Sequence, residues 1–241
     1  MQKTVLITGC SGQLGDRLYK DLSVHFKVIP TYRKHQNKEY SLDITSPIDC
    51  DYIFSNNDID VVINCAAITD VDLCEMDKKL CRDVNVAGLN RLIASSKVGA
   101  KIIHISSDYV FDGFDGNYLE NNLTHPINYY GKSKLESENI LIGSNRDHLI
   151  FRVSTLFDNS HNNFLTWVLN SLKNKKYIRV ANDMFSTPTW IPAFSNVITK
   201  SIYLDMSGIF HYGSSNSVSR LDFALSIAEE FGGSKDLIKS V

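Results

Sequence analysis

The sequence predicts an α/β fold in which a doubly wound parallel sheet carries helices on both faces. Short, almost continuously apolar runs such as "KTVLIT", "VVINC" and "KIIHIS" alternate with segments of helical pattern. Strands that are apolar along their whole length are typical of parallel sheets covered on both faces. The first strand also leads into a glycine-rich turn, and ligand sites of such sheets lie at the carboxyl ends of the strands.

The expected elements of the main domain, residues 1–155, alternate in chain order. Strands are expected at 3–8, 27–32, 61–65, 101–106 and 148–154, and helices at 14–24, near 51–55, at 78–97 and from Tyr130 onward. After residue 154 the pattern loosens into short runs and turns. We therefore expect residues 156–241 to form a smaller C-terminal part, which is too small for a large core of its own and packs on the first.

Composition narrows the function classes. Lys and Arg number 25 against 27 Asp and Glu, with no basic stripe, which argues against a nucleic-acid partner. The apolar runs are too short to span a bilayer, and the N-terminus enters a strand at once, so neither a membrane nor a signal peptide is expected. Five cysteines without a C-x-x-C pair indicate free thiols in the cytoplasm. The histidines lack ligand spacing, so no metal is expected.

The turn "TGCSGQLG" is the first candidate binding site. Glycines allow a tight turn and a close approach of backbone to ligand, and the N-terminus of the following helix offers free N–H groups to a phosphate. The spacing is G-x-x-G-x-x-G rather than G-x-G-x-x-G. Its position between a strand and a helix favours phosphate binding over a packing role. The residues expected there are Gly9, Ser11, Gly12, Gln13, Leu14 and Gly15.

The segment after the second strand is where a dinucleotide's ribose would be read. It contains Arg33 and Lys34, and the next acidic residue is Glu39. Cations pair with a 2′-phosphate, whereas an acid would bond a free 2′-hydroxyl. NADP(H) is therefore the preferred cofactor, with NAD(H) as the alternative. Asp43 and Ile44 are expected to follow the third strand, beside the adenine ring.

The stretch "PINYYGKSKLESEN" contains a spaced phenol and ammonium. On a helix, residues i and i+4 lie on the same face, which pairs Tyr130 with Lys134 and leaves Tyr129 and Lys132 unmatched. By itself this pattern also fits a solvated helix start.

Taken together with "INCAAITDVD" and "HISSDYVFDG", these motifs resemble the extended short-chain dehydrogenase/reductases. More narrowly, the chain resembles the dTDP-4-dehydrorhamnose reductase family, which includes the reductase-like regulatory subunit of methionine adenosyltransferase. The resemblance implies a Rossmann-type NAD(P)-binding domain and a small substrate-binding part. It implies a catalytic set of Ser107, Tyr130 and Lys134, of which Tyr130 and Lys134 would also contact the cofactor. Asn64, Ala66 and Ala67 would line the cofactor behind the fourth strand.

In such a set, hydride passes from the nicotinamide to a ketone carbon while Tyr130 protonates the oxygen and Ser107 polarises the carbonyl. A free phenol has a pKa of about 10. We expect the Lys134 ammonium and the nicotinamide charge to lower the pKa of Tyr130.

The leading interpretation is an NADP(H)-dependent reductase of a nucleotide-linked 4-keto-6-deoxy sugar, with a homodimer left open. Candidate substrate contacts are Tyr109, Thr155, Asn163 and Trp190. Thr155 stands where the reductases usually carry a Trp, and relatives continue beyond Val241 with a segment that helps close the site, so the C-terminal part is expected to be shorter than theirs. A nucleotide-sugar epimerase is one alternative; a dehydratase would need a second acid after Asp108. The other is a non-catalytic NADP-binding regulatory subunit.

Overall fold

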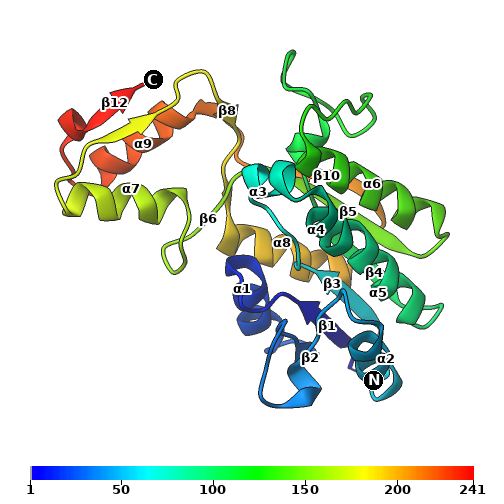
Figure 1. Ribbon diagram of the computed structural model, residues 1–241. Helices are drawn as coiled ribbons and strands as arrows, with labels where there is room; N and C mark the ends of the chain where they lie inside the picture. Colours follow the sequence, from blue (N-terminus) through cyan, green and yellow to red (C-terminus); the bar gives the residue numbers. More distant parts are fainter. Residues whose placement is uncertain (1) are drawn as a thin grey trace. The chain divides into compact units, whose positions relative to one another are not determined.

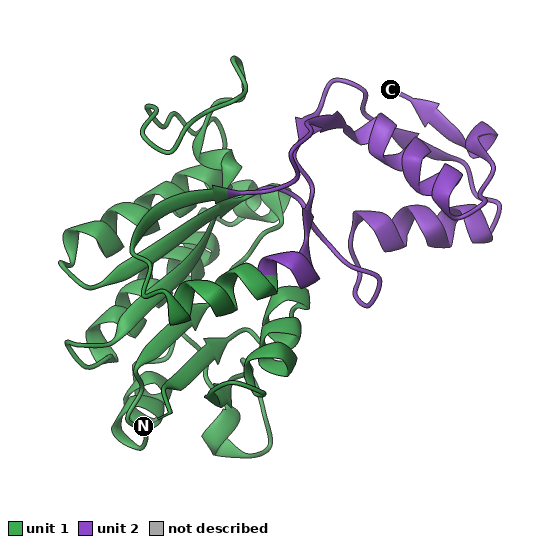
Figure 2. Ribbon diagram, turned by 180° about the vertical axis from the view of Figure 1, so that it is seen from behind, with its two compact units in different colours: residues 1–153, 195–211 green, residues 154–194, 212–241 purple. Residues whose placement is uncertain are grey.

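A computed structural model describes residues 2–241, which form two compact units. Of the described residues, the first unit comprises 2–153 and 195–211, and the second comprises 154–194 and 212–241 (Figure 2).

The first unit is built on a six-stranded sheet with the order β10-β5-β4-β3-β1-β2 (Figure 1). Its strands are β1 (Thr4–Thr8), β2 (Lys27–Pro30), β3 (Val61–Asn64), β4 (Lys101–Ser107), β5 (His148–Val153) and β10 (Gly208–Tyr212). The pairs β1–β2, β1–β3, β3–β4 and β4–β5 are all parallel. The predicted α/β fold with a parallel sheet is therefore confirmed.

Helices cover both faces of this sheet. They are α1 (Gln13–Leu22), α2 (Pro47–Ser55), α3 (Val71–Met76), α4 (Lys78–Arg82), α5 (Leu89–Ser95) and α6 (Tyr129–Gly143), with α8 (Ile191–Tyr203) from the later chain and short 3-10 turns η1 (Lys38–Tyr40) and η3 (Asp108–Val110). Leu6, Val62 and Ile102 pack with α2, α5 and α6 in one buried cluster. The end of α8 contacts the segment between α1 and β2, with the rings of Tyr203 and Phe26 5.0 Å apart.

The helix expected over residues 78–97 is present from Lys78 to Ser95, but its middle is π-helical rather than α-helical. The structure gives α4, then a π-helical segment η2 (Asp83–Gly88), then α5, which ends at Ser95. Asn85 explains the wider turn. Its side-chain oxygen accepts from the Ile68 N–H at 2.8 Å, and its nitrogen donates to the Ile68 carbonyl and the Ser133 hydroxyl, each at 3.0 Å. The π turn thus connects the helix to the loop after β3 and to α6.

The segment containing Asp43 and Ile44 does not follow a strand of the sheet, contrary to the prediction. Tyr32 and Ser41 form only an isolated bridge, and a polar 3-10 turn occupies the intervening chain. Consequently Asn64 ends the third strand along the chain, not the fourth.

The second unit has its own small core. It contains β6 (Leu156–Phe157), α7 (Phe164–Lys173), β7 (Ile178–Val180), β8 (Phe185–Ser186), β9 (Thr189–Trp190), β11 (Val218–Ser219), α9 (Arg220–Glu230), η4 (Lys235–Leu237) and β12 (Ile238–Ser240). Apolar residues of α7 and α9, with β7 and β12, form one buried cluster. The continuous second part expected over 156–241 differs from this division, because β10 joins the main sheet beside β5 and residues 195–211 belong to the first unit.

Some site types are not found among residues 2–241. No helix there is long and apolar enough to cross a bilayer, and no three or more His, Cys, Asp or Glu side chains are grouped as metal ligands. All five cysteines are free thiols.

Candidate active site

The turn after β1 meets the loop after β3 at the carboxyl edge of the sheet. Gly9 has a positive φ of 71°, and a Cβ there would lie 3.0 Å from the Ala66 nitrogen. Only glycine tolerates both the conformation and the approach. The strand order reverses between β1 and β3, which is the position where sheets of this type bind ligands.

Helix α1 begins directly at this turn. Gly12 is its N-cap and has no side chain to satisfy the first N–H groups. A Cβ at Gly15 would lie 2.4 Å from the Gly9 carbonyl oxygen, so the helix packs tightly on the turn. Ser11 is exposed and Gln13 half-buried, whereas the Leu14 side chain is buried in the core and offers a ligand only its backbone.

The predicted ribose-reading segment is open to solvent. Arg33 and Lys34 are exposed, and the neighbouring Tyr32 and His35 rings stack with their centroids 5.2 Å apart. Asp43 accepts hydrogen bonds from the Thr45 backbone and hydroxyl. The Ile44 side chain is buried in the core, so only its backbone could flank a ligand.

Asn64 has a structural role that the sequence did not indicate. Its oxygen accepts from the Thr8 hydroxyl at 2.8 Å, and its nitrogen lies 3.3 Å from Nδ1 of His104. The side chain is buried and joins β1, β3 and β4, while Ala66 and Ala67 beyond it are half-buried.

Ser107 and Tyr130 come together where α6 meets the end of β4. Asn128 caps α6 by accepting from the Gly131 N–H at 2.8 Å. A Cβ at Gly131 would lie 2.1 Å from the Tyr109 carbonyl oxygen, so a side chain there would push the helix away. The Ser107 hydroxyl lies close enough to the Tyr130 phenol to lower the pKa of that phenol, a proximity that spacing alone could not show.

The expected lowering of the Tyr130 pKa depends on the nicotinamide charge and stays a prediction. In the protein itself, burial raises the pKa of Tyr130 above its ordinary value, and the nearby Ser107 hydroxyl only partly opposes this. The Tyr109 and Tyr130 rings meet edge to face at 5.7 Å, and Cys74 and Cys81 pack in the same cluster. The apolar wall outweighs the hydroxyl because it disfavours the phenolate.

Tyr129 and Lys132, the other tyrosine and lysine of this stretch, have different surroundings. Tyr129 receives the Lys78 ammonium over its ring, and its backbone N–H donates to Glu75. Lys132 is exposed. The i, i+4 argument therefore selected the two residues whose side chains are buried together.

Lys134 is fully buried on α6. Its Nζ donates to the Ile105 carbonyl oxygen at 2.6 Å and lies 3.3 Å from Nε2 of His104. Burial lowers the pKa of Lys134 to about 8, although Glu138 acts in the opposite direction. His104 is buried and hydrogen-bonded, and it lies directly against this amine.

A buried ion pair behind Lys134 was not predicted. Arg152 on β5 binds Glu138 on α6 through Nη2 at 2.8 Å, and Glu138 also accepts from the Ser106 hydroxyl. Arg152 further donates to the Glu120 carbonyl and so attaches the loop after η3. An arginine inside the apolar run "HLIFRV" was the available signal.

The remaining predicted substrate contacts lie in the second unit, whereas Tyr109 lies in the first. Thr155 is half-buried, and its carbonyl accepts from the Thr189 N–H at 2.8 Å. Asn163 is the N-cap of α7: it accepts from Thr166 and donates to the Asp158 carbonyl. Trp190 is exposed.

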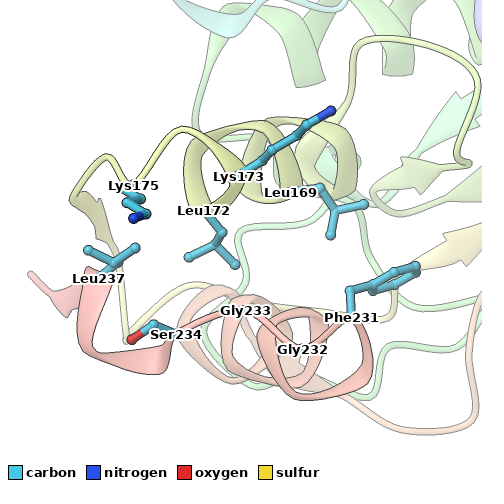
Figure 3. Close-up of a pocket in the computed structure, with 9 residues that line it drawn as sticks. All are labelled: Leu169, Leu172, Lys173, Lys175, Phe231, Gly232, Gly233, Ser234 and Leu237. Atoms are coloured by element: carbon cyan, nitrogen blue, oxygen red, sulfur yellow. The ribbon is translucent and has the colours of Figure 1, made fainter.

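Two cavities lie within the second unit. One, of about 580 Å³, is lined by Asn163, Phe164, Trp167, Arg179, Val180, Ala181, Met184, Arg220 and Val241. The other, of about 690 Å³, lies between the ends of α7 and α9 and is mainly apolar, with Lys173 and Lys175 at its side (Figure 3). The smaller cavity, of about 580 Å³, combines two guanidinium groups with two aromatic rings, a combination that the sequence did not reveal.

Comparison with known proteins then decides the family. The model for the RmlD substrate binding domain matches residues 2–241. The chain belongs to this RmlD family. The family resemblance predicted from the motifs is therefore confirmed.

Curated relatives of this RmlD family member span most of its length. The dTDP-4-dehydrorhamnose reductase of Aggregatibacter actinomycetemcomitans is 35% identical over 240 residues, which cover 94% of this chain and 78% of the relative. The enzyme of the same name from Escherichia coli K12 is 30% identical, covering 94% and 77%.

Solved structures agree with the fold. The dTDP-4-dehydrorhamnose reductase of Bacillus anthracis, solved in complex with NADP, matches with a TM-score of 0.93 at 30% identity and covers all of this chain and 84% of that one. The Clostridium acetobutylicum orthologue matches at 0.89 with 35% identity, covering 99% and 82%. A Thermus thermophilus UDP-glucose 4-epimerase matches at 0.84 but at 15% identity, a likeness of fold alone.

Proposed function

We propose that this RmlD family member is an NADP(H)-dependent reductase of a nucleotide-linked 4-keto-6-deoxy sugar, with dTDP-4-dehydrorhamnose as the first candidate. The observation that carries the proposal is the proximity of the Ser107 and Tyr130 side chains, with Lys134 buried one helical turn further along α6. The names of the curated relatives and the NADP bound to one solved relative support it.

The residues present fit the cofactor. The Gly9–Gly15 turn and the uncapped start of α1 would receive the pyrophosphate, and the exposed Arg33 would pair with the 2′-phosphate. The Lys134 amine would hold the nicotinamide ribose. When bound, NADPH supplies the hydride.

The protein's own groups would manage the proton. Because burial raises the pKa of Tyr130, its phenol stays protonated near neutrality and is ready to donate to the oxygen of a reduced ketone. The Ser107 hydroxyl, beside Asp108 at 3.1 Å, would orient the same oxygen. The raised pKa of the phenol therefore suits the reducing direction.

The smaller cavity of the second unit is proposed to take the nucleotide of the substrate. Arginine matches phosphate oxygens with two parallel hydrogen bonds, and flat rings stack on a base. Arg220 lies over the Phe164 ring at 5.6 Å, and Trp167 contacts the same ring. Residues 1–155 would thus act as the cofactor domain and most of 156–241 as the substrate part.

A turnover assay tests the proposal. Purified protein with NADPH is given dTDP-4-dehydrorhamnose, and in parallel UDP- and GDP-linked 4-keto-6-deoxy sugars, while NADPH absorbance and the reduced sugar are measured. We expect stoichiometric loss of NADPH and of the ketone with at least one sugar, and loss of both signals in Tyr130→Phe. Tight NADPH binding with no reduction of any sugar would instead support the regulatory-subunit alternative.

A further inference from the structure

His104 is a buried titratable side chain that the proposed chemistry does not use. It lies on β4 with 1% of its surface exposed, and its Nε2 is 3.3 Å from Nζ of Lys134. Burial, and then the Lys134 charge, lower the pKa of His104 well below its ordinary value, so the ring is neutral and carries one proton. The ring nitrogen that carries this proton determines whether the Lys134 amine faces a hydrogen-bond donor or an acceptor.

The hydrogen bonds on the Nδ1 side of the ring locate the proton. The Ala66 N–H donates to the Thr8 hydroxyl oxygen at 3.1 Å, so the Thr8 hydroxyl proton is free to go to the Asn64 oxygen at 2.8 Å. The Asn64 nitrogen is thereby turned toward His104, 3.3 Å from Nδ1. A donor on this side requires Nδ1 to be the acceptor.

The hydrogen bonds on the Nε2 side of the ring lead to the same position for the proton. The Ser137 hydroxyl donates its proton to the Lys134 carbonyl at 2.7 Å, so its oxygen is left to accept from Nε2 of His104 at 3.1 Å. The proton therefore lies on Nε2, on the same side of the ring as the lysine amine. This single N–H is shared between the Ser137 oxygen at 3.1 Å and the Lys134 nitrogen at 3.3 Å. A neutral amine can accept from it, whereas an ammonium would meet a second donor.

We propose that His104 is a positioning residue for Lys134, and that Thr8 and Asn64 fix the ring in the orientation this requires. The inference rests on the function proposed for Lys134. The chain of contacts begins one residue before Gly9 and includes the backbone of Ala66. It thereby joins the turn expected to hold the pyrophosphate to the amine expected to hold the ribose.

Other groups also face the amine and must be held constant in any pH experiment. Glu138 lies on the same helix, Cys65 follows β3, and Cys81 lies on α4; each favours the charged lysine. His104 is the group that presents a donor to it.

The test compares two replacements of His104 in the full chain. His104→Phe keeps the ring volume and removes both nitrogens, and His104→Gln retains a donor of similar reach. We expect His104→Phe to lower kcat by about ten- to a hundredfold, to raise KM for NADPH and to shift the pH profile of turnover. His104→Gln should recover most of kcat and restore the profile.

Thermal unfolding of each variant separates positioning from folding. A folded His104→Phe protein with unchanged kcat, KM and pH profile would overturn the inference, while Lys134→Ala measured alongside would still report on the proposed function. If His104→Phe does not fold, nitrogen-15 NMR of the unmodified protein's histidine rings decides. A neutral ring with its proton on Nε2 supports the proposal, and a proton on Nδ1 or a charged ring refutes it.

Discussion

The carboxyl edge of the main sheet and the smaller cavity of the second unit are built in opposite ways. At the sheet edge, Ser107, Tyr130 and Lys134 are each less than a tenth exposed and have fixed partners. In the cavity, Trp167 and Met184 are each 44% exposed. Buried, fully bonded groups hold a geometry to fractions of an ångström, whereas exposed rings and arginines adapt. Under the function proposed above, the chemistry would be fixed by the fold and substrate choice would be set by replaceable side chains.

The largest effect should come from the phenol at the sheet edge. Tyr130→Phe keeps the ring in its apolar cluster and removes the proton donor, so we expect kcat to fall by about 10²–10⁴ while NADPH affinity barely changes. Tyr129→Phe is the matched control, since that ring packs against Lys78. Steady-state kinetics measure kcat, and calorimetric titration measures the affinity for NADPH. Near-full turnover in Tyr130→Phe would contradict the role of Tyr130 as proton donor.

The pH dependence of stability should reveal the buried amine. The folded-state pKa of Lys134 is about 8, against about 10.4 unfolded, so the unfolded chain binds more protons between these values and stability rises there with pH. The shift corresponds to about 3 kcal/mol. Lys134→Met should abolish this rise.

Urea unfolding from about pH 7 to about pH 10 measures the difference between the two proteins. That difference is the useful quantity, because the raised pKa of buried thiols such as Cys50 lowers the stability of both proteins as the pH rises above about 9. Lys132→Met, at an exposed position of the same helix, is the control. Parallel pH curves for Lys134→Met and the unmodified protein would show that the buried amine stays charged.

In the cavity, Arg220→Gln should act on binding alone. Losing a charge-assisted hydrogen bond to a phosphate costs about 1.5–3 kcal/mol, which raises KM for the nucleotide sugar roughly ten- to a hundredfold at constant kcat. Lys173→Gln, which alters the other cavity (Figure 3), should leave KM unchanged. A drop in kcat would place Arg220 in the chemistry instead.

The exposed turn after β2 resembles the smaller cavity, because a substitution of its arginine should also change ligand binding alone. Arg33→Ala should narrow the preference for NADPH over NADH by up to about 1.5–3 kcal/mol, with the solvent-exposed position favouring the lower value. Lys38→Ala is the control from the same segment, because that ammonium lies over the Tyr52 ring at 4.4 Å. Calorimetric titration of both cofactors decides, and equal affinities in the unmodified protein would refute the assignment.

The smallest effect is expected at Thr155. A threonine leaves more space and a hydroxyl where relatives carry a ring, so we expect a preference for a bulkier or more polar keto sugar. Thr155→Trp should shift relative kcat/KM toward dTDP-4-dehydrorhamnose by about two- to tenfold, the value of one aromatic contact. If the unmodified protein is already selective for that sugar, the wider site is disproved.

The same contrast explains what the sequence could predict. Apolar strands, the glycine turn and the Tyr130–Lys134 spacing are local patterns, and they correctly predicted the parallel sheet and the two side chains that are buried together. The burial that raises the pKa of Tyr130 could not be predicted, because the residues packed around this side chain, Cys74, Cys81 and Tyr109, come from three other segments. The Thr8–Asn64–His104 contacts cross three strands, and no spacing rule reports them.

The π turn between α4 and α5 has a consequence for how the chain tolerates change in length. A π turn is an α-helix with one residue more than its register allows, and each helical residue turns the chain by about 100°. Deleting one residue within Asp83–Gly88 would restore a regular α-helix but rotate Asn85 away from Ile68 and Ser133. Lineages of this protein should therefore accept side-chain exchanges on the outer surface of this helix while rejecting deletions within it.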